Sequence, residues 1–475
     1  MPVPSRRTLH PLVLALAVMA NLPATAAADG PTFTARLDSK WALYASNNVF
    51  WDLGARIGAP TDTLDANFGE SWLEPGFDVT APYAGGSVYG GLSLGASGTW
   101  RTDPLGYRDH SVVALENALV GWRNAPAEGG WGFDVSAGQQ DYAVGNGMLL
   151  RMGAGNGAER GGTMLAPRTA WEIAGIARAS RGPLALHAYF LQPNELDSND
   201  TRTRLWGVLG EYKPAQAQRY GATYFKVTNS EQVYPRADRP LEFIERGRDG
   251  LEVLHGWAEF NPAPQAAPFL GLRFEGALQR NDDIDLHAEG VSAEVSWLFA
   301  ARRFTPKVSY SWSRLSGDDP STTRYERFDP MYYGGSLDTW WFGANSAFAL
   351  INSNFRVHRL SALLVASPRD FVKLQLLDFR ADELRSPLQF GQITRLEFGD
   401  GGLNLFSGVT EPHLTTEAYA EWTRMLAPNL ALTGVLSWAR PGDGFESVRP
   451  GSGDLRDWTT IGMVLSWSLP APTAP

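Results

Sequence analysis

The residues best suited to chemistry in this chain are the arginines of one glycine-rich segment, 141–168. Arg151, Arg160 and Arg168 each carry a planar guanidinium, whose forked N–H donors match the two oxygens of a carboxylate. A connection this long can fold back into a pore and narrow it. The segment therefore predicts a filter for anionic solutes, although the same arginines would also suit a flexible extracellular loop that faces solvent.

Charged side chains also recur along one face of several segments in which apolar and polar residues alternate. If that polar face points inward, it lines a lumen with the basic residues Arg36, Lys40, Arg273, Lys307 and Lys373. The same face carries the acids Asp38, Asp134, Glu275, Glu294, Glu417 and Glu421. A conduit for a polyanion should present a net positive constriction. Because the signs are mixed, structural pairing across a wall is the favoured interpretation, and contact with a substrate is the alternative.

Residues with the chemistry of an enzyme or a metal site do not cluster in the sequence. Beyond the N-terminal leader the histidines are His110, His187, His255, His287, His358 and His413. None stands in a Gly-x-Ser-x-Gly setting, and no pair has metal-ligand spacing. Cysteine is absent, which removes thiolate chemistry. We therefore expect no catalytic residue, no metal and no cofactor, and keep a hydrolase assembled from distant strands as the alternative from another functional class.

Strands with a two-residue period must position the charged residues. In the segment 33–45, Phe33, Trp41 and Leu43 lie on one face and charged residues lie opposite. The last such segment, 457–469, alternates large apolar side chains with small ones. This alternation predicts strands with one apolar face. A lipid-facing barrel and a soluble sandwich would both produce it, but the placement of Trp and Tyr near strand ends favours the barrel.

The connections between these segments fall into two length classes that alternate along the chain. Eight short turns bearing Gly, Pro or Asn alternate with nine connections that are mostly longer. The nine are expected at 46–70, 98–111, 141–168, 192–201, 228–250, 280–285 (the short exception), 315–355, 381–413 and 441–456. The count gives about 18 strands, an even number, as in an all-β transmembrane antiparallel β-barrel with short periplasmic turns and long extracellular loops. A barrel of this size encloses an aqueous channel rather than a packed core.

The two ends of the chain carry signals of their own. Residues 1–28 contain Arg6 and Arg7, a short apolar run and small residues for cleavage, which predicts a secretory signal peptide. The barrel would then span 29–469. The formal charge of −10 becomes −12 without the two leader arginines, which argues against a nucleic-acid partner. Residues 470–475 include three prolines, which cannot extend a strand, so a disordered periplasmic tail is expected.

Three stretches carry a family resemblance. They are Leu-Glu-Asn-Ala-Leu-Val-Gly-Trp-Arg at 115–123 leading into 135–142, Arg-Tyr-Glu-Arg-Phe-Asp-Pro-Met-Tyr-Tyr-Gly-Gly at 324–335 with 352–355, and Trp-Ala-Arg-Pro-Gly-Asp-Gly-Phe at 438–445. They resemble the alginate export family of outer-membrane porin-like proteins. The resemblance implies a monomeric barrel of 18 strands in the cell outer membrane, and passive export of an anionic polysaccharide such as alginate.

Pattern and resemblance together predict an outer-membrane channel for passive passage of solutes. The expected partners are outer-membrane lipid and either an anionic sugar polymer or small solutes. A general porin for small solutes is the alternative within transport. We expect a monomer.

Overall fold

The architecture is that of a computed structural model, which describes residues 30–52, 65–154, 159–165, 168–334, 339–388, 395–399, 402–406, 408–448 and 455–469. For 395–399 and 402–406 only the backbone is described. The signal peptide expected at 1–28 and the tail expected at 470–475 lie outside the described residues.

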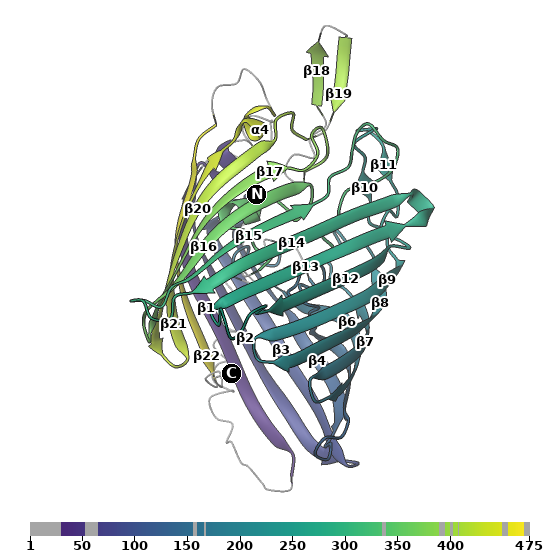
Figure 1. The fold of residues 1–475 in the computed structure, drawn as a ribbon, viewed down its shortest axis with the longest axis vertical. Coiled ribbons are helices and arrows are strands. Elements are labelled where there is room, and N and C mark those ends of the chain that lie inside the picture. Colours follow the sequence, from purple (N-terminus) through teal and green to yellow (C-terminus); the bar gives the residue numbers. More distant parts are fainter. Residues whose placement is uncertain are drawn as a thin grey trace, which may run out of the picture.

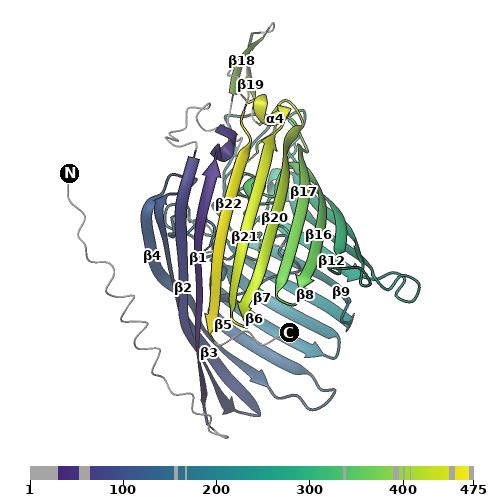
Figure 2. The same ribbon diagram turned by 90° about the vertical axis from the view of Figure 1, so that its left-hand side faces the viewer.

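The described residues form a closed antiparallel β-barrel of 18 strands (Figures 1 and 2). The strands are β1 (Thr32–Asn47), β2 (Asp65–Tyr83), β3 (Gly86–Thr102), β4 (Arg108–Asn124), β5 (Gly132–Asp141), β6 (Ala170–Arg181), β7 (Leu184–Gln192), β8 (Arg204–Ala215), β9 (Gln218–Asn229), β12 (Glu252–Phe260), β13 (Leu270–Asn281), β14 (Leu286–Leu298), β15 (Lys307–Leu315), β16 (Phe355–Ser367), β17 (Asp370–Ala381), β20 (His413–Ala427), β21 (Leu430–Pro441) and β22 (Trp458–Leu469). Each strand pairs with the next, and β22 pairs with β1 from Leu37↔Leu469 to Asn47↔Thr459, which closes the barrel. The predicted fold class and strand number are confirmed.

The two faces of the strands point as the alternation predicts. On β1, Trp41 and Leu43 are exposed, whereas Ala42 and Tyr44 are buried. On β22, Ile461 and Met463 are exposed and lie beside β1 in the sheet. The outer surface is therefore apolar along these stretches, whereas polar residues such as Arg356 and His358 of β16 are exposed near the long-connection end.

The connections alternate between the two ends of the barrel. Two-residue links at 84–85, 182–183, 216–217, 368–369 and 428–429 lie at one end. The longest connections, 142–169, 230–251, 316–354 and 382–412, lie at the other, where the hairpin β18–β19 projects (Figure 1). The link between β13 and β14 is short, as expected.

Several boundaries differ from the prediction; for example, β4 begins at Arg108, inside the loop expected at 98–111. The strand β2 begins at Asp65, inside the loop expected at 46–70, and β3 continues to Thr102, inside the loop expected at 98–111. In 65–70 the polar residues Asp65 and Asn67 are exposed, while Ala66, Phe68 and Glu70 are buried. Polarity alone therefore suggested a loop.

The remaining elements are small and lie in the connections between the barrel strands. They are η1 (Val49–Asp52), β10 (Tyr234–Pro235), β11 (Phe243–Ile244), η2 (Asp282–Ile284), α3 (Asn345–Ala349), β18 (Arg395–Gly399), β19 (Gly402–Phe406) and α4 (Asp443–Glu446). Within the described ranges, no helix is long and apolar enough to cross a membrane.

The interior at the long-loop end is packed, which differs from the expected water-filled tube. Buried apolar side chains of the connections form one cluster with inward-facing strand residues. The connection residues include Phe50, Trp51, Val144, Leu149, Leu150, Leu165, Trp340, Phe342 and Phe445. Because these long connections contain enough apolar residues to form a core of their own, they occupy part of the lumen.

An arginine on the outer face tests whether that face contacts lipid. Leu376 lies in the middle of β17 and is 51% exposed. Leu376→Arg should lower the free energy of unfolding in lipid vesicles by about 2–4 kcal/mol, because the charge would lie in hydrocarbon. The matched control is Leu384→Arg, an exposed position in the connection after β17, which should change that free energy by less than about 0.5 kcal/mol. Equal effects at both positions would contradict a lipid-facing outer surface.

Candidate functional site

Two connections, 142–169 and 316–354, are held against the inner wall of the barrel by four buried glutamates. Glu70 comes from β2, Glu116 from β4, Glu275 from β13 and Glu417 from β20. All four are at most 3% exposed. The backbone N–H groups of a connection inside a barrel need acceptors, and these wall carboxylates supply some of them.

Two of these glutamates bind the end of connection 142–169. Glu70 accepts hydrogen bonds from the backbone N–H groups of 163–165, at 2.7, 2.9 and 2.8 Å in chain order. Glu116 accepts from Nη1 of Arg168 at 3.0 Å and from the backbone N–H of Thr169 at 3.3 Å. These bonds fix the segment where it returns to β6.

Glu275 joins the two connections to each other. One carboxylate oxygen accepts from Nε2 of His255 at 2.9 Å. The other accepts from Nδ2 of Asn146 at 3.1 Å and from the indole N–H of Trp340 at 2.9 Å. The backbone N–H groups of Arg151 and Met152 also donate to the carbonyl of Tyr332. The two connections therefore form a single in-folded unit.

Glu417 holds the turn before helix α3. It accepts from the backbone N–H groups of Ala344 at 2.7 Å and Ser346 at 2.8 Å, and from the hydroxyl of Ser437 at 2.7 Å. Gly343 has φ +79°, and a Cβ there would lie 2.5 Å from the Glu417 carboxylate. Glycine is thus required for this close approach.

The three arginines of the predicted filter have different surroundings. The Arg168 side chain is fully buried, pairs with Glu116 and lies over Trp72. Its charge holds the connection and is not open to the lumen, which corrects the prediction for this residue. Arg160 is also buried and donates to the backbone and side-chain oxygens of Asn194. Arg151 is half-buried.

The basic residues predicted on the wall lie mostly beside acids. Arg36 lies 3.6 Å from Asp78 and 3.9 Å from Glu74, and Arg273 lies 2.6 Å from Glu294. Lys40 interacts electrostatically with Asp38 and Glu74. Lys373 Nζ lies 5.7 Å from the ring centroid of Tyr419. Lys307 is exposed at the start of β15. Arg36 and Arg273 thus pair with acids on neighbouring strands.

A cavity of about 520 Å³ lies between the long connections. Its lining includes Tyr234, Arg248, Tyr325, Arg327, Asp329, Tyr332, Tyr333 and Trp341. Apolar and aromatic walls with a few convergent polar groups are typical of small-molecule sites, and the volume lies in their usual range. Sequence reasoning singled out 324–335 as a motif but did not predict that its residues line a cavity.

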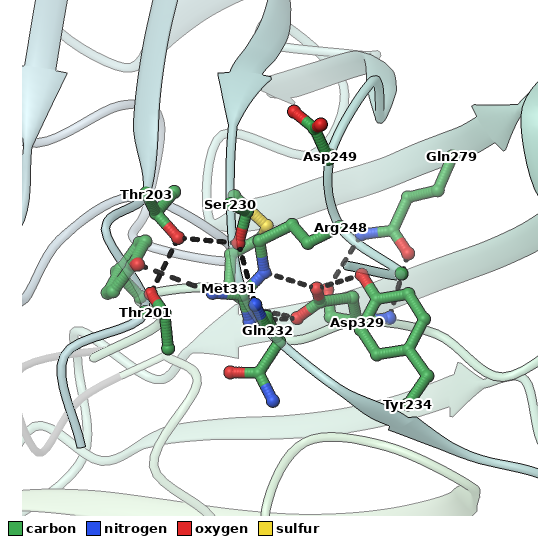
Figure 3. A network of polar contacts seen from close by, with 12 residues as sticks. Thr201, Thr203, Ser230, Gln232, Tyr234, Arg248, Asp249, Gln279, Asp329 and Met331 are labelled. Carbon is green, nitrogen blue, oxygen red and sulfur yellow. Dashed lines mark hydrogen bonds and ion pairs between the residues drawn. The ribbon is translucent and has the colours of Figure 1, made fainter. Parts of the chain in front are cut away.

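A network of polar contacts forms one wall of this cavity (Figure 3). Arg248 binds Asp329 through Nε at 2.6 Å and Nη2 at 2.9 Å, and the Tyr234 hydroxyl donates to the same carboxylate at 2.5 Å. Burial acts to raise the pKa of Asp329, but Arg248 and Tyr234 outweigh it and hold this pKa below its ordinary value. Gln279 of β13 exchanges hydrogen bonds with the Asp329 backbone, which ties the network to the barrel wall.

The histidines of the described part bond to groups other than serine. His255 pairs with Glu275, and His358 and His187 contact tyrosine hydroxyls. Across the described ranges, no group of three or more His, Asp or Glu residues could hold a metal ion.

Comparison with known proteins gives structural matches only. No family model matches the chain, and no curated protein matches it in sequence. The fold is similar to that of OccK8 (OprE) of Pseudomonas aeruginosa, with a TM-score of 0.55, 9% identity and coverage of 92% of this chain and 98% of that chain. It is similar to OccK2 (OpdF) of the same organism in complex with glucuronate, with a TM-score of 0.53, 13% identity and coverage of 92% and 96%.

A third similar structure is Pseudomonas aeruginosa OpdK with vanillate, with a TM-score of 0.51, 10% identity and coverage of 92% and 98%. At these identities the likeness establishes the fold. The alginate export resemblance has no matching family model.

Replacing Glu417 should release the turn before α3. Glu417→Gln removes the charge and turns an amide N–H toward backbone donors, which should cost about 1.5–3 kcal/mol of local stability. Cleavage by added chymotrypsin at 339–350 should then accelerate about tenfold or more. Glu421→Gln is the matched control, because Glu421 lies four residues along the same strand and accepts a hydrogen bond from the hydroxyl of Tyr419 of that strand. Equal cleavage rates for both variants would contradict the claim that Glu417 holds the turn before α3.

Removing Arg168 should destabilise the barrel. Arg168→Gln leaves the Glu116 carboxylate buried without its cation, which typically costs about 3–5 kcal/mol. Urea unfolding in lipid vesicles measures the change. Arg101→Gln alters an exposed arginine of β3 and should change stability by less than about 0.5 kcal/mol. A similar small effect for both would mean that the buried pair does not hold the connection.

Proposed function

We propose that this protein is a channel for passive diffusion of small solutes across the outer membrane. The observation that carries the proposal is the combination of a closed barrel with an apolar outer face and two long connections folded into its lumen. An apolar outer face suits hydrocarbon, and 18 strands leave room for an interior passage. In-folded connections then set the size and chemistry of what passes.

The orientation of the barrel supports this proposal. β22 ends at Leu469 on the side of the two-residue links, which are the short periplasmic turns of outer-membrane barrels. The long connections with the cavity would face the outside of the cell. Outer-membrane lipid is then the partner of the outer face, and the closed pairing of β1 with β22 lets a single chain form the barrel.

Small solutes suit the interior better than a polyanion such as alginate. A polymer conduit needs a continuous positive track. Here Arg168, Arg36 and Arg273 lie against carboxylates, so their charges are largely compensated. Support for alginate export consists of the three short motifs. The ligands named for two similar barrels, glucuronate and vanillate, are small organic acids, and we propose solutes of that size here.

A channel is also preferred over an outer-membrane hydrolase. A serine hydrolase needs a histidine within hydrogen-bond reach of its nucleophile. Tyrosine and glutamate side chains instead contact His187, His255 and His358. No role in catalysis is proposed for these residues.

Planar-bilayer recording and liposome swelling test the proposal. The purified, folded protein should give discrete conductance steps in a lipid bilayer. Proteoliposomes should swell in small sugars and organic acids at rates that fall with solute mass, and should not swell in alginate oligomers. Heat-denatured protein is the control. The absence of channel current would contradict the channel, and passage of alginate oligomers in preference to monomeric acids would contradict the small-solute preference.

A further inference from the structure

Two outward-facing arginines occupy opposite positions on neighbouring strands near the long connections. Arg356 of β16 and Arg380 of β17 are partners in the register of these two strands, which lie side by side in the wall (Figure 1). Their side chains are 46% and 54% exposed. Arg314 of β15 is the partner of Arg356 on its other side, so three arginines form one row across three strands. Like charges directly opposite each other destabilise a sheet, so this row needs anions beside it.

One buried carboxylate orients two arginines of the row. Oδ1 of Asp382, whose side chain is fully buried, accepts from Nε of Arg356 at 2.6 Å and from Nε of Arg314 at 2.7 Å. Arg314 has a second acceptor in Glu289. Glu383 acts on Arg356 electrostatically without a hydrogen bond. Arg356 thus bonds through Nε alone, and its Nη1 and Nη2 groups donate to no acceptor among the described residues.

Arg380 is held in the same way. Its Nε donates to Oδ2 of Asp378 at 3.0 Å, while Oδ1 of that carboxylate lies 3.2 Å from Nε2 of His413. In the part of the chain that the structure describes, Nη1 and Nη2 of Arg380 likewise have no acceptor. Arg356 and Arg380 therefore present their terminal N–H groups outward from adjacent positions. A phosphate fits this donor set, because its oxygens can accept from more than one guanidinium.

The residues next to the pair place it at the edge of the lipid hydrocarbon. On β17 the outward-facing positions after Arg380 and Asp378, toward the short links, are Leu376 and Leu374, and both leucines are exposed. Tyr310 of β15 lies at the level of Leu376 and is exposed as well. Exposed tyrosines mark the boundary between hydrocarbon and head groups. The arginine pair lies beyond that boundary, at the level of the head groups.

The pair faces away from the interior of the barrel. The neighbours of Arg356 on alternate positions of β16, Val357 and Arg359, are buried on the inner side. A solute inside the barrel therefore does not meet the terminal N–H groups of Arg356, whereas a lipid beside the wall does. Clusters of basic residues next to the hydrocarbon are the usual recognition sites for anionic lipid head groups.

We propose that Arg356 and Arg380 bind a phosphate group of lipid A, the phosphorylated glycolipid anchor of lipopolysaccharide in the outer leaflet. The site rests on the proposed function for the orientation that places the long connections outside the cell, and it specifies which outer-membrane lipid this face contacts. The phosphate accepts from the Nη groups of both arginines and compensates the like charges of the row. The acyl chains lie along Leu376 and Leu374.

Native mass spectrometry of the full-length protein in detergent measures lipid binding directly. The probes are lipid A with two phosphates and the same lipid with both phosphates removed. The unaltered protein should bind the phosphorylated form about tenfold or more tightly than the other. Replacing both residues, Arg356→Gln with Arg380→Gln, should remove that preference and leave binding of the dephosphorylated lipid unchanged, because the contacts to the acyl chains remain.

Single variants and a matched control separate binding from folding. Arg356→Gln and Arg380→Gln alone each keep one guanidinium and should bind phosphorylated lipid A with intermediate affinity, a readout that holds even if the double variant does not fold. Arg280→Gln is the control, because Arg280 is exposed at the same end of β13 but bonds to Asp282 and is the partner of His287. Its affinity for lipid A should equal that of the unaltered protein.

The lipid site and the channel proposal fail in different ways. Equal binding of the two forms of lipid A, or unchanged binding after both arginines are replaced, would overturn the site even if the barrel conducts. Tighter binding of phosphatidylglycerol than of lipid A would overturn the assignment to the outer leaflet. Absence of conductance in the unaltered protein would overturn the channel, whereas phosphate-selective binding that requires Arg356 and Arg380 would still establish the lipid site.

Discussion

The interior of this barrel depends on wall carboxylates that accept backbone N–H groups from connections folded into the lumen. Inside a closed sheet most strand backbone groups are paired with one another, so the backbone N–H groups of an incoming connection need additional acceptors. Glu70, Glu116, Glu275 and Glu417 provide the acceptors, and each is buried. A charged acceptor makes stronger hydrogen bonds than a neutral one, and the low dielectric of a packed interior strengthens them further.

The need for these acceptors explains the distribution of charge inside the barrel. Arg168 forms an ion pair with Glu116, which holds the end of connection 142–169. The wall arginines Arg36 and Arg273 lie beside acids of neighbouring strands. The charges that could have formed a positive track are therefore used to hold the structure. What remains for a solute is the aromatic cavity between the connections. The chemistry of the passage thus belongs to the connections more than to the strands.

Local features of the sequence were sufficient to predict the barrel. The two-residue period of 33–45 and 457–469 assigned their faces correctly, because lipid or a core on one side imposes a simple alternation. The alternation of connection lengths gave the strand number, since it reflects which end of the barrel each turn occupies. The start of β2 was missed because its exposed residues, Asp65 and Asn67, are polar and resemble a loop.

The site depends on contacts that leave no local signature. Glu70 meets Leu165 across 95 positions of sequence, and Ala344 meets Glu417 across 73. Such distant contacts could not be predicted from the sequence. The predicted filter therefore included Arg168 with Arg151 and Arg160, although Arg168 pairs with Glu116 of β4. The segment 324–335 was visible as a motif, but its place beside Tyr234 and Arg248 follows from the fold.

The central claim is that the wall glutamates hold connections 142–169 and 316–354 inside the barrel. Hydrogen–deuterium exchange of the unaltered protein in lipid bilayers tests this claim most directly. The account predicts that the backbone amides of 163–165 and 344–346 exchange as slowly as those of the flanking strands. Exchange of these amides at the rate of an unstructured, solvent-exposed loop would contradict it.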